Sequence, residues 1–298
     1  MSAPMVLRAR AGAPIAQVRR ALTDAQALRT WLAEHAEVDL PGRYAFWGRY
    51  TPEGTTPTQR PVYVDEHTLR FVWPLGGEDT TVELSLAEEG PGSTIVSVTQ
   101  THVPDWAQVV AEEGPRSVLA TFWTLSIANL VDYVEGRELT PKCDFAAEGL
   151  SGTVVIDAAP EAVFRSLMEP ERFGQWFGAT VEVEPHVGGR WAMGGFGVDK
   201  DVDNSVATII DLVPDRRVGL DWGNMTSTWE LADSDGGTRL TFVHSGFDER
   251  NPPHAGWLGW LGGVSELRRF HELADWRPIW FEHRIPGTPQ HVLAASAR

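Results

Sequence analysis

The sequence contains very little cysteine and no long hydrophobic run. Cys143 is the single cysteine among 298 residues, which excludes an internal disulfide and a zinc site built from several cysteines. No stretch of about 18 apolar residues could form a membrane-spanning helix, and the N-terminus lacks a charged region followed by an apolar core. We therefore expect a cytoplasmic protein that does not insert into membranes.

Positive charge is also scarce. The chain has 25 basic and 41 acidic residues, a net charge of −16, and only Lys142 and Lys200 are lysines. Such a chain repels nucleic-acid phosphates and anionic lipid. A neutral small molecule or a basic protein partner therefore fits its charge better than a nucleic acid does.

Tryptophan, in contrast, is abundant. The chain has 13 tryptophans, nearly half of its aromatic residues, within an ordinary apolar fraction of 42%. The length suggests two domains of about 150 residues each, and each would be large enough to bury its own core.

The two halves of the sequence repeat one another at a spacing of about 145 residues. The matched segments follow in the same order in both halves, which indicates a tandem duplication of one domain. The pairs are residues 42–46 (GRYAF) with 189–193 (GRWAM), 69–73 with 218–222, 82–84 with 229–231, 94–101 with 238–245, and Trp31 with Trp176 and Trp123 with Trp260.

Hydrophobic periodicity predicts the elements of each copy. Residues 6–11 alternate as a first strand does, and Pro14 and Pro160 stand where a helix can begin. Alternating strands follow, separated by turn-rich segments. Trp123, Ile127, Leu130 and Val134 recur at helical spacing in a long last helix, and the second copy has its counterpart.

We therefore predict an α+β fold in which a curved antiparallel sheet wraps around one long C-terminal helix, twice. The predicted boundaries are domain 1 over residues 1–136, a linker over 137–150, domain 2 over 151–284 and a C-terminal tail over 285–298.

These patterns resemble a known superfamily. An A-P-x-x-V-x-x-x-L helix, a G-R-aromatic strand, an L-x-F-x-W strand and T-x-L-T-x-x-H-S-G-F before a tryptophan-led helix are similar to the SRPBCC superfamily, the helix-grip fold of START lipid-binding and polyketide cyclase proteins. The branch homologous to chaperone-ATPase activators is the most similar. The first copy departs at residues 100–103 (QTHV), where the second has residues 244–247 (HSGF), so the two copies need not be equivalent.

The resemblance implies an apolar cavity between each sheet and its helix. Aromatic walls with few polar groups suit a hydrophobic or aromatic ligand, although the same side chains could simply fill a core. The candidate ligand-binding residues are Tyr44, Phe46, Phe71, Trp73 and Trp123 in copy 1, and Trp191, Met193, Trp222, Trp229, Phe242, His244, Trp257 and Trp260 in copy 2.

His244 is the best single candidate for catalysis. It continues the inward alternation of Leu240 and Phe242, so a buried imidazole could orient a ligand carbonyl or act as a general base. A satisfied core histidine is the alternative. Arg43 and Arg190 should face away from the cavity.

Other apparent motifs are incomplete. His271 lacks the second histidine of a zinc helix because Asp275 stands there, and the aspartates of residues 199–203 are followed by Ile210 where a calcium loop needs Glu. The glycine-rich residues 256–263 lack the Lys of a phosphate loop and could form a pliable entrance before the last helix. We predict neither a metal site nor a cofactor.

Three functions remain open. The first is binding of a hydrophobic small molecule, such as a metabolite, a polyketide or a lipid, with domain 2 favoured. The second is a cyclase or dehydratase that uses the same cavity. The third is a chaperone-regulating module whose acidic surface binds a basic partner. The sequence leaves the oligomeric state open.

Overall fold

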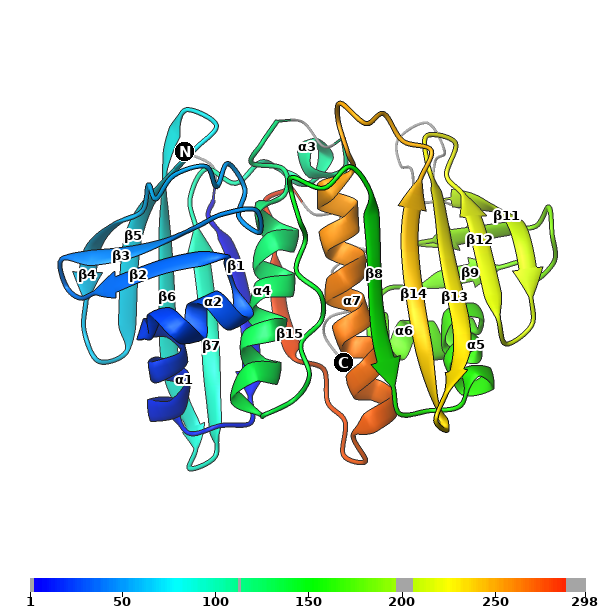
Figure 1. Cartoon of the computed structure of the whole chain (residues 1–298), viewed down its shortest axis with the longest axis horizontal. Helices are drawn as coiled ribbons and strands as arrows, with labels where there is room; N and C mark the ends of the chain where they lie inside the picture. Colours follow the sequence, from blue (N-terminus) through cyan, green and yellow to red (C-terminus); the bar gives the residue numbers. More distant parts are fainter. Residues whose placement is uncertain (1–2, 112–113, 197–205, 288–298) are drawn as a thin grey trace. The chain divides into compact units, whose positions relative to one another are not determined.

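The computed structural model describes residues 3–111, 114–196 and 206–287 (Figure 1). The chain divides into two compact units. Unit 1 takes in the chain up to residue 146 together with residues 254–262 and the segment from residue 279, and unit 2 takes in residues 147–253 and 263–278. No described helix is long and apolar enough to cross a membrane.

Unit 1 contains a six-stranded antiparallel sheet in the order β15-β1-β7-β6-β5-β4 and a separate hairpin of β2 and β3. Its elements are β1 (Met5–Ala11), α1 (Ile15–Thr23), α2 (Ala25–Trp31), β2 (His35–Asp39), β3 (Arg43–Trp47), β4 (Arg60–Val64), β5 (Thr68–Leu75), β6 (Glu78–Gly90), β7 (Ser93–Gln100), α3 (Trp106–Val110), α4 (Leu119–Val134) and β15 (Trp280–Arg284).

Unit 2 contains a seven-stranded antiparallel sheet in the order β8-β14-β13-β12-β11-β10-β9. Its elements are β8 (Leu150–Ile156), α5 (Pro160–Met168), α6 (Pro170–Phe177), β9 (Val181–Val183), β10 (Arg190–Met193), β11 (Val206–Val213), β12 (Arg217–Asp221), β13 (Thr226–Ser234), β14 (Gly237–Ser245) and the second half of α7 (His254–Glu272).

The predicted duplication is visible in matching details of the two units. The indole N–H of Trp31 donates to the carbonyl of Ala21 at 3.0 Å, and that of Trp176 donates to the carbonyl of Ser166 at 2.9 Å. Both donors are buried, so each indole satisfies its polar atom in the same way, ten residues back along the chain. The predicted α+β fold of two helix-grip domains is confirmed.

The strand registers correct one of the predicted repeat pairs. Gln100 pairs with Met5 and with Val82, whereas His244 pairs with Leu150 and with Ser227. Gln100 and His244 are therefore equivalent, as predicted. The same registers place Trp229 at the position of Leu84 rather than of Val82.

The C-terminal segment differs from the predicted boundaries. Residues 280–284, which the sequence suggested were the end of domain 2, form β15 and pair with β1 in the sheet of unit 1 (Figure 1). Leu7 stands opposite His283, and the backbone N–H of Arg10 donates to the carbonyl of Ile279 at 2.8 Å. An edge strand carries no local signal for the sheet that it joins, so its short alternating pattern could not identify the partner.

Residues 137–146 of the predicted linker pack on unit 1 as an ordered segment, and residues 147–150 belong to unit 2. The fully buried Asn129 side chain donates to the carbonyl of Thr140 and accepts from its backbone N–H, both at 3.0 Å. The ammonium group of Lys142 donates to the carbonyls of Arg29 and Thr30 at the C-terminal end of α2. A cation is favourable at that end of a helix because unsatisfied carbonyls gather there.

Candidate ligand-binding site

The five candidate residues of unit 1 form a closed aromatic cluster. Each is at most 1% exposed. The ring centroid of Phe46 lies 5.9 Å from Phe71, 5.1 Å from Trp73 and 6.5 Å from Trp123, all in edge-to-face contact. Tyr44 contacts Phe71 at 5.2 Å, and burial raises the pKa of its hydroxyl. These contacts are those of a hydrophobic core, and a ligand role for the set stays a prediction.

A buried amide completes this cluster. The indole N–H of Trp123 donates to Oε1 of Gln100 at 2.7 Å, and Nε2 of Gln100 donates to the Thr80 hydroxyl at 2.9 Å. Gln100 and Thr80 are fully buried. The departure of residues 100–103 from the family motif was the signal for this network, because a glutamine at an inward position needs several polar partners. The sequence shows the departure at Gln100 but not the partners of its side chain.

The candidate residues of unit 2 form a more open group. Trp191, Trp229 and Phe242 are buried, whereas Met193 and Trp222 are only half-buried. The ring of Trp191 lies edge-to-face on Trp222, with centroids 5.8 Å apart, and Trp229 lies 3.9 Å from Phe242. The indole N–H of Trp222 donates to the Ser227 hydroxyl at 2.8 Å.

His244 lies at the end of β14, among these aromatic side chains. It is 2% exposed, and its ring is edge-to-face with Phe242 at 4.8 Å. Burial lowers the pKa of its imidazole to about 3, because a charged ring would lose its hydration. His244 is therefore neutral at pH 7, and a neutral imidazole both donates and accepts a hydrogen bond.

Two candidates, Trp257 and Trp260, lie on the first half of α7. Both are buried, and residues 254–262 belong to unit 1 rather than to unit 2. Gly259 comes close to Thr121 of α4, within the same unit. The glycine-rich residues 256–263 are helical throughout, so the prediction of a pliable segment before the helix is wrong. Small residues here permit close approach of another helix instead.

The polar groups that sequence analysis set aside have structural partners. Arg43 forms an ion pair with Glu37 at 2.9 Å, and Arg190 forms one with Glu184 at 2.7 Å; all four side chains are exposed by more than a third. His271 lies 3.0 Å from the Ser166 hydroxyl. The aspartates at 199, 201 and 203 lie outside the described residues.

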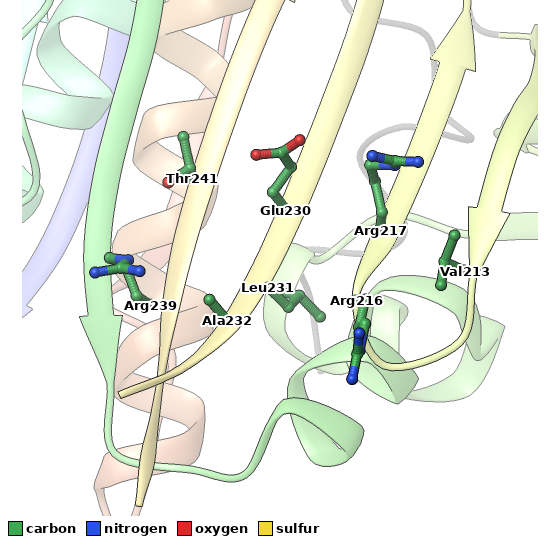
Figure 2. A pocket seen from close by; sticks show the side chains of 8 residues that line it. All are labelled: Val213, Arg216, Arg217, Glu230, Leu231, Ala232, Arg239 and Thr241. Carbon is green, nitrogen blue, oxygen red and sulfur yellow. The ribbon is translucent and has the colours of Figure 1, made fainter. Parts of the chain in front are cut away.

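A pocket lies on the other face of the unit 2 sheet, away from the candidate residues. Its volume is about 420 Å³. Trp229, Leu240 and Phe242 point into the core, so the residues between them, including Glu230, Arg239 and Thr241, point outward to line this pocket (Figure 2). The sequence alone does not reveal this pocket, because a surface hollow depends on which short and long side chains become neighbours across strands.

The family can now be identified. The model of the family described as "Activator of Hsp90 ATPase homolog 1-like protein" matches residues 12–135 and 157–267. The chain belongs to this family. The two matched segments are the two copies seen in the sequence and in the fold, so this activator-homology protein is a tandem of two SRPBCC-type domains.

The solved structures that match this chain have low sequence identity to it and low TM-scores. DynU16, from the dynemicin biosynthetic locus, is 18% identical over 90% of this chain and 99% of its own, with a TM-score of 0.35. CalU16 from Micromonospora echinospora is 20% identical over 41% of this chain and 75% of its own, with a TM-score of 0.33. The Aha1 dimer from Colwellia psychrerythraea is 17% identical over 43% of this chain and 98% of its own, with a TM-score of 0.36. No curated protein matches the chain.

Proposed function

We propose that unit 2 binds an apolar small molecule, aromatic or lipid-like, through the side chains around Trp222. The observation that supports this is a contrast between equivalent positions. Phe46 and Trp73 of unit 1 are at most 1% exposed, whereas their counterparts in unit 2, Met193 and Trp222, remain half-buried. The same fold positions are thus sealed in one copy and accessible in the other.

The chemistry of these side chains fits such a ligand. The ring of Trp222, which packs against buried Trp191, offers flat apolar surface at a low cost in conformational entropy, and the flexible side chain of Met193 adapts to ligands of different shape. Near them, Ser227 and the neutral His244 occupy directly paired positions on β13 and β14. Both are buried, so a ligand that enters past Trp222 would find in them the few polar groups that fix the orientation of a mostly apolar molecule.

The experiment uses N-phenyl-1-naphthylamine, a neutral probe whose fluorescence increases in apolar surroundings. We expect saturable binding to the full chain, and we expect Trp222→Ala and Met193→Ala each to weaken it about tenfold, as the loss of a large apolar contact would. Tyr63→Ala is the matched control, because Tyr63 is a 47% exposed aromatic residue on β4 of unit 1. The proposal would be contradicted if all three substitutions weakened binding equally, or if neither Trp222→Ala nor Met193→Ala weakened it.

Binding is favoured over catalysis by the state of His244. A general base works best when its pKa lies near the working pH, and the pKa of His244 is lowered to about 3. Its imidazole can orient a hydroxyl or carbonyl group of a ligand but is a weak proton acceptor at neutral pH. The cyclase or dehydratase function stays a prediction without an observation that supports it.

A chaperone partner is the second candidate, and family membership is the observation that favours it. The net charge of −16 suits a basic surface on such a partner. If this chain regulates an Hsp90-type ATPase, adding it should raise the rate of ATP hydrolysis, and the effect should weaken as salt is raised. An unchanged rate at low salt would exclude this candidate for the ATPase tested.

A further inference from the structure

The pocket on the outer face of the unit 2 sheet, called here the outer hollow, is formed by strand register. Arg217 of β12, Glu230 of β13 and Thr241 of β14 occupy one row across three strands. In the next row on the same face, Ala232 stands opposite Arg239. The backbone N–H of Leu231 donates to the carbonyl of Arg216 at 2.7 Å, which places Arg216 on the other side of β13.

Ala232 is the reason that a hollow exists here. Its side chain is a single methyl group, and long side chains surround it: Arg239 on one side, Arg216 and Arg217 on the other, and Glu230 two residues back along β13 (Figure 2). Neighbouring strands lie about 4.8 Å apart, so the backbones on either side of β13 are roughly 10 Å from each other. The volume of about 420 Å³ lies within the range of small-molecule sites.

The charges around the outer hollow are not balanced. Arg217 forms an ion pair with Asp211 at 2.6 Å. Arg216 and Arg239 form no ion pair with any carboxylate in the described part of the chain, although acidic residues exceed basic ones by 16 overall. Some exposed arginines elsewhere have such partners, for example Arg60 with Asp79 and Arg250 with Asp248, both at 2.8 Å, whereas Arg20 and Arg277 have none among the described residues.

We propose that the outer hollow binds a small molecule through one anionic group, a phosphate or a carboxylate, held over Ala232 between Arg216 and Arg239. Guanidinium groups bind both kinds of oxyanion in a planar, paired geometry. Glu230 repels a second negative charge at the other end, so the rest of the ligand is neutral or carries hydrogen-bond donors such as hydroxyl or amino groups. This site is independent of the apolar one proposed above, because it lies on the opposite face of the sheet.

The test is a pair of NMR titrations of the full chain at constant ionic strength, one with inorganic phosphate and one with acetate. The Nε–Hε signals of the arginines report contact with the anion. We expect saturable shifts at Arg216 and Arg239 in at least one series, and the series that saturates identifies the anionic group. Absence of saturation in both series would overturn the proposal.

Two substitutions separate a built site from general attraction to positive charge. Ala232→Leu fills the hollow without changing any charge, and Arg239→Gln removes one guanidinium group; each should weaken binding about tenfold or more. Thr228→Leu, further along the same outward face of β13, and Arg277→Gln, an exposed arginine elsewhere in unit 2, are the matched controls and should change it less than about twofold. Equal weakening by Arg277→Gln, or full binding by Ala232→Leu, would show a non-specific anion effect and overturn the proposal. Because Arg239 is exposed, its substitution tests the site even if Ala232→Leu fails to fold.

Discussion

Gln100 and His244 show how one position serves two purposes in the two copies. Both side chains point inward, and both residues lie near the C-terminal end of the strand that pairs with the first strand of their unit. Gln100 joins Trp123 and Thr80 in a closed network at full burial. His244 instead pairs with Ser227, whose hydroxyl accepts from half-buried Trp222, and is held neutral by burial. A change of one inward polar residue therefore accompanies the difference between a sealed and an accessible group of aromatic side chains.

His283 on β15 makes the stability of unit 1 sensitive to pH. Its Nε2 lies 3.0 Å from the Thr124 hydroxyl, which donates its own hydrogen to Ala120 and so accepts from the imidazole. Burial lowers the pKa of His283 to about 4, whereas an unfolded histidine titrates near 6.5. As the pH falls below about 6.5 the unfolded chain takes up the proton first. The contribution of neutral His283 to the stability of the folded state is therefore complete above pH 6.5 and is lost as the pH falls from about 6.5 to about 4.

We predict that His283→Gln flattens this pH dependence. Glutamine retains a donor for Thr124 but does not titrate, so the slope of the unfolding free energy should fall by up to about 1.4 kcal/mol per pH unit between pH 6 and 4.5. Urea unfolding at several pH values measures it. His67→Gln, at an exposed position, is the control and should leave the slope unchanged. An unchanged slope in the His283 variant would show that the residue does not titrate in this range.

At the scale of elements, α7 contains two glycines with different surroundings. A Cβ atom on Gly259 would lie 3.4 Å from Cγ2 of Thr121, close to an ordinary contact, whereas one on Gly263 would lie 2.7 Å from a ring atom of Phe177. Phe177 cannot move away easily, because its ring stacks on Phe173 at 4.8 Å. Packing therefore requires glycine at position 263, whereas position 259 has room for a larger residue such as alanine.

We predict opposite effects of alanine at these two positions. Gly259→Ala should be neutral or stabilise the protein by up to about 1 kcal/mol, since alanine is the better helix former. Gly263→Ala should destabilise it by roughly 1–3 kcal/mol, since the added methyl group overpacks the core. Thermal unfolding of both variants measures the difference. A melting temperature for Gly263→Ala at or above that of the unaltered protein would contradict this interpretation of the helix.

At the scale of the whole molecule, the fold of the two domains could be predicted from local and repeated sequence patterns. Alternating burial in strands such as β7 and β14, the paired Trp31 and Trp176, and the family resemblance together predicted two α+β domains. The pairing of β15 with β1 was not predictable, because a short strand does not specify a distant partner. Of the candidate site, sequence indicated which residues face inward. It could not show that Trp73 is sealed while Trp222 is half-buried, because exposure depends on tertiary packing.

The position of β15 predicts that unit 1 depends on the end of the chain. Removing the residues after Pro278 should leave the edge of β1 unpaired, so that hydrogen exchange of the Arg10 amide, which donates to Ile279 in the full chain, becomes faster and unit 1 unfolds at a lower temperature. A chain that ends at Gly287 keeps β15 and is the matched control. Equal exchange rates at β1 in the two truncated chains would show that β15 contributes little to the stability of unit 1.

The discontinuity of unit 1 also has a consequence for biosynthesis. A ribosome adds about 5–20 residues per second, so β1 is made on the order of tens of seconds before β15. During that interval β1 has an open edge, where strands of other chains can pair. The domain that is translated first can thus complete its sheet only after the second domain has been translated, and the nascent chain must be protected from intermolecular pairing until then.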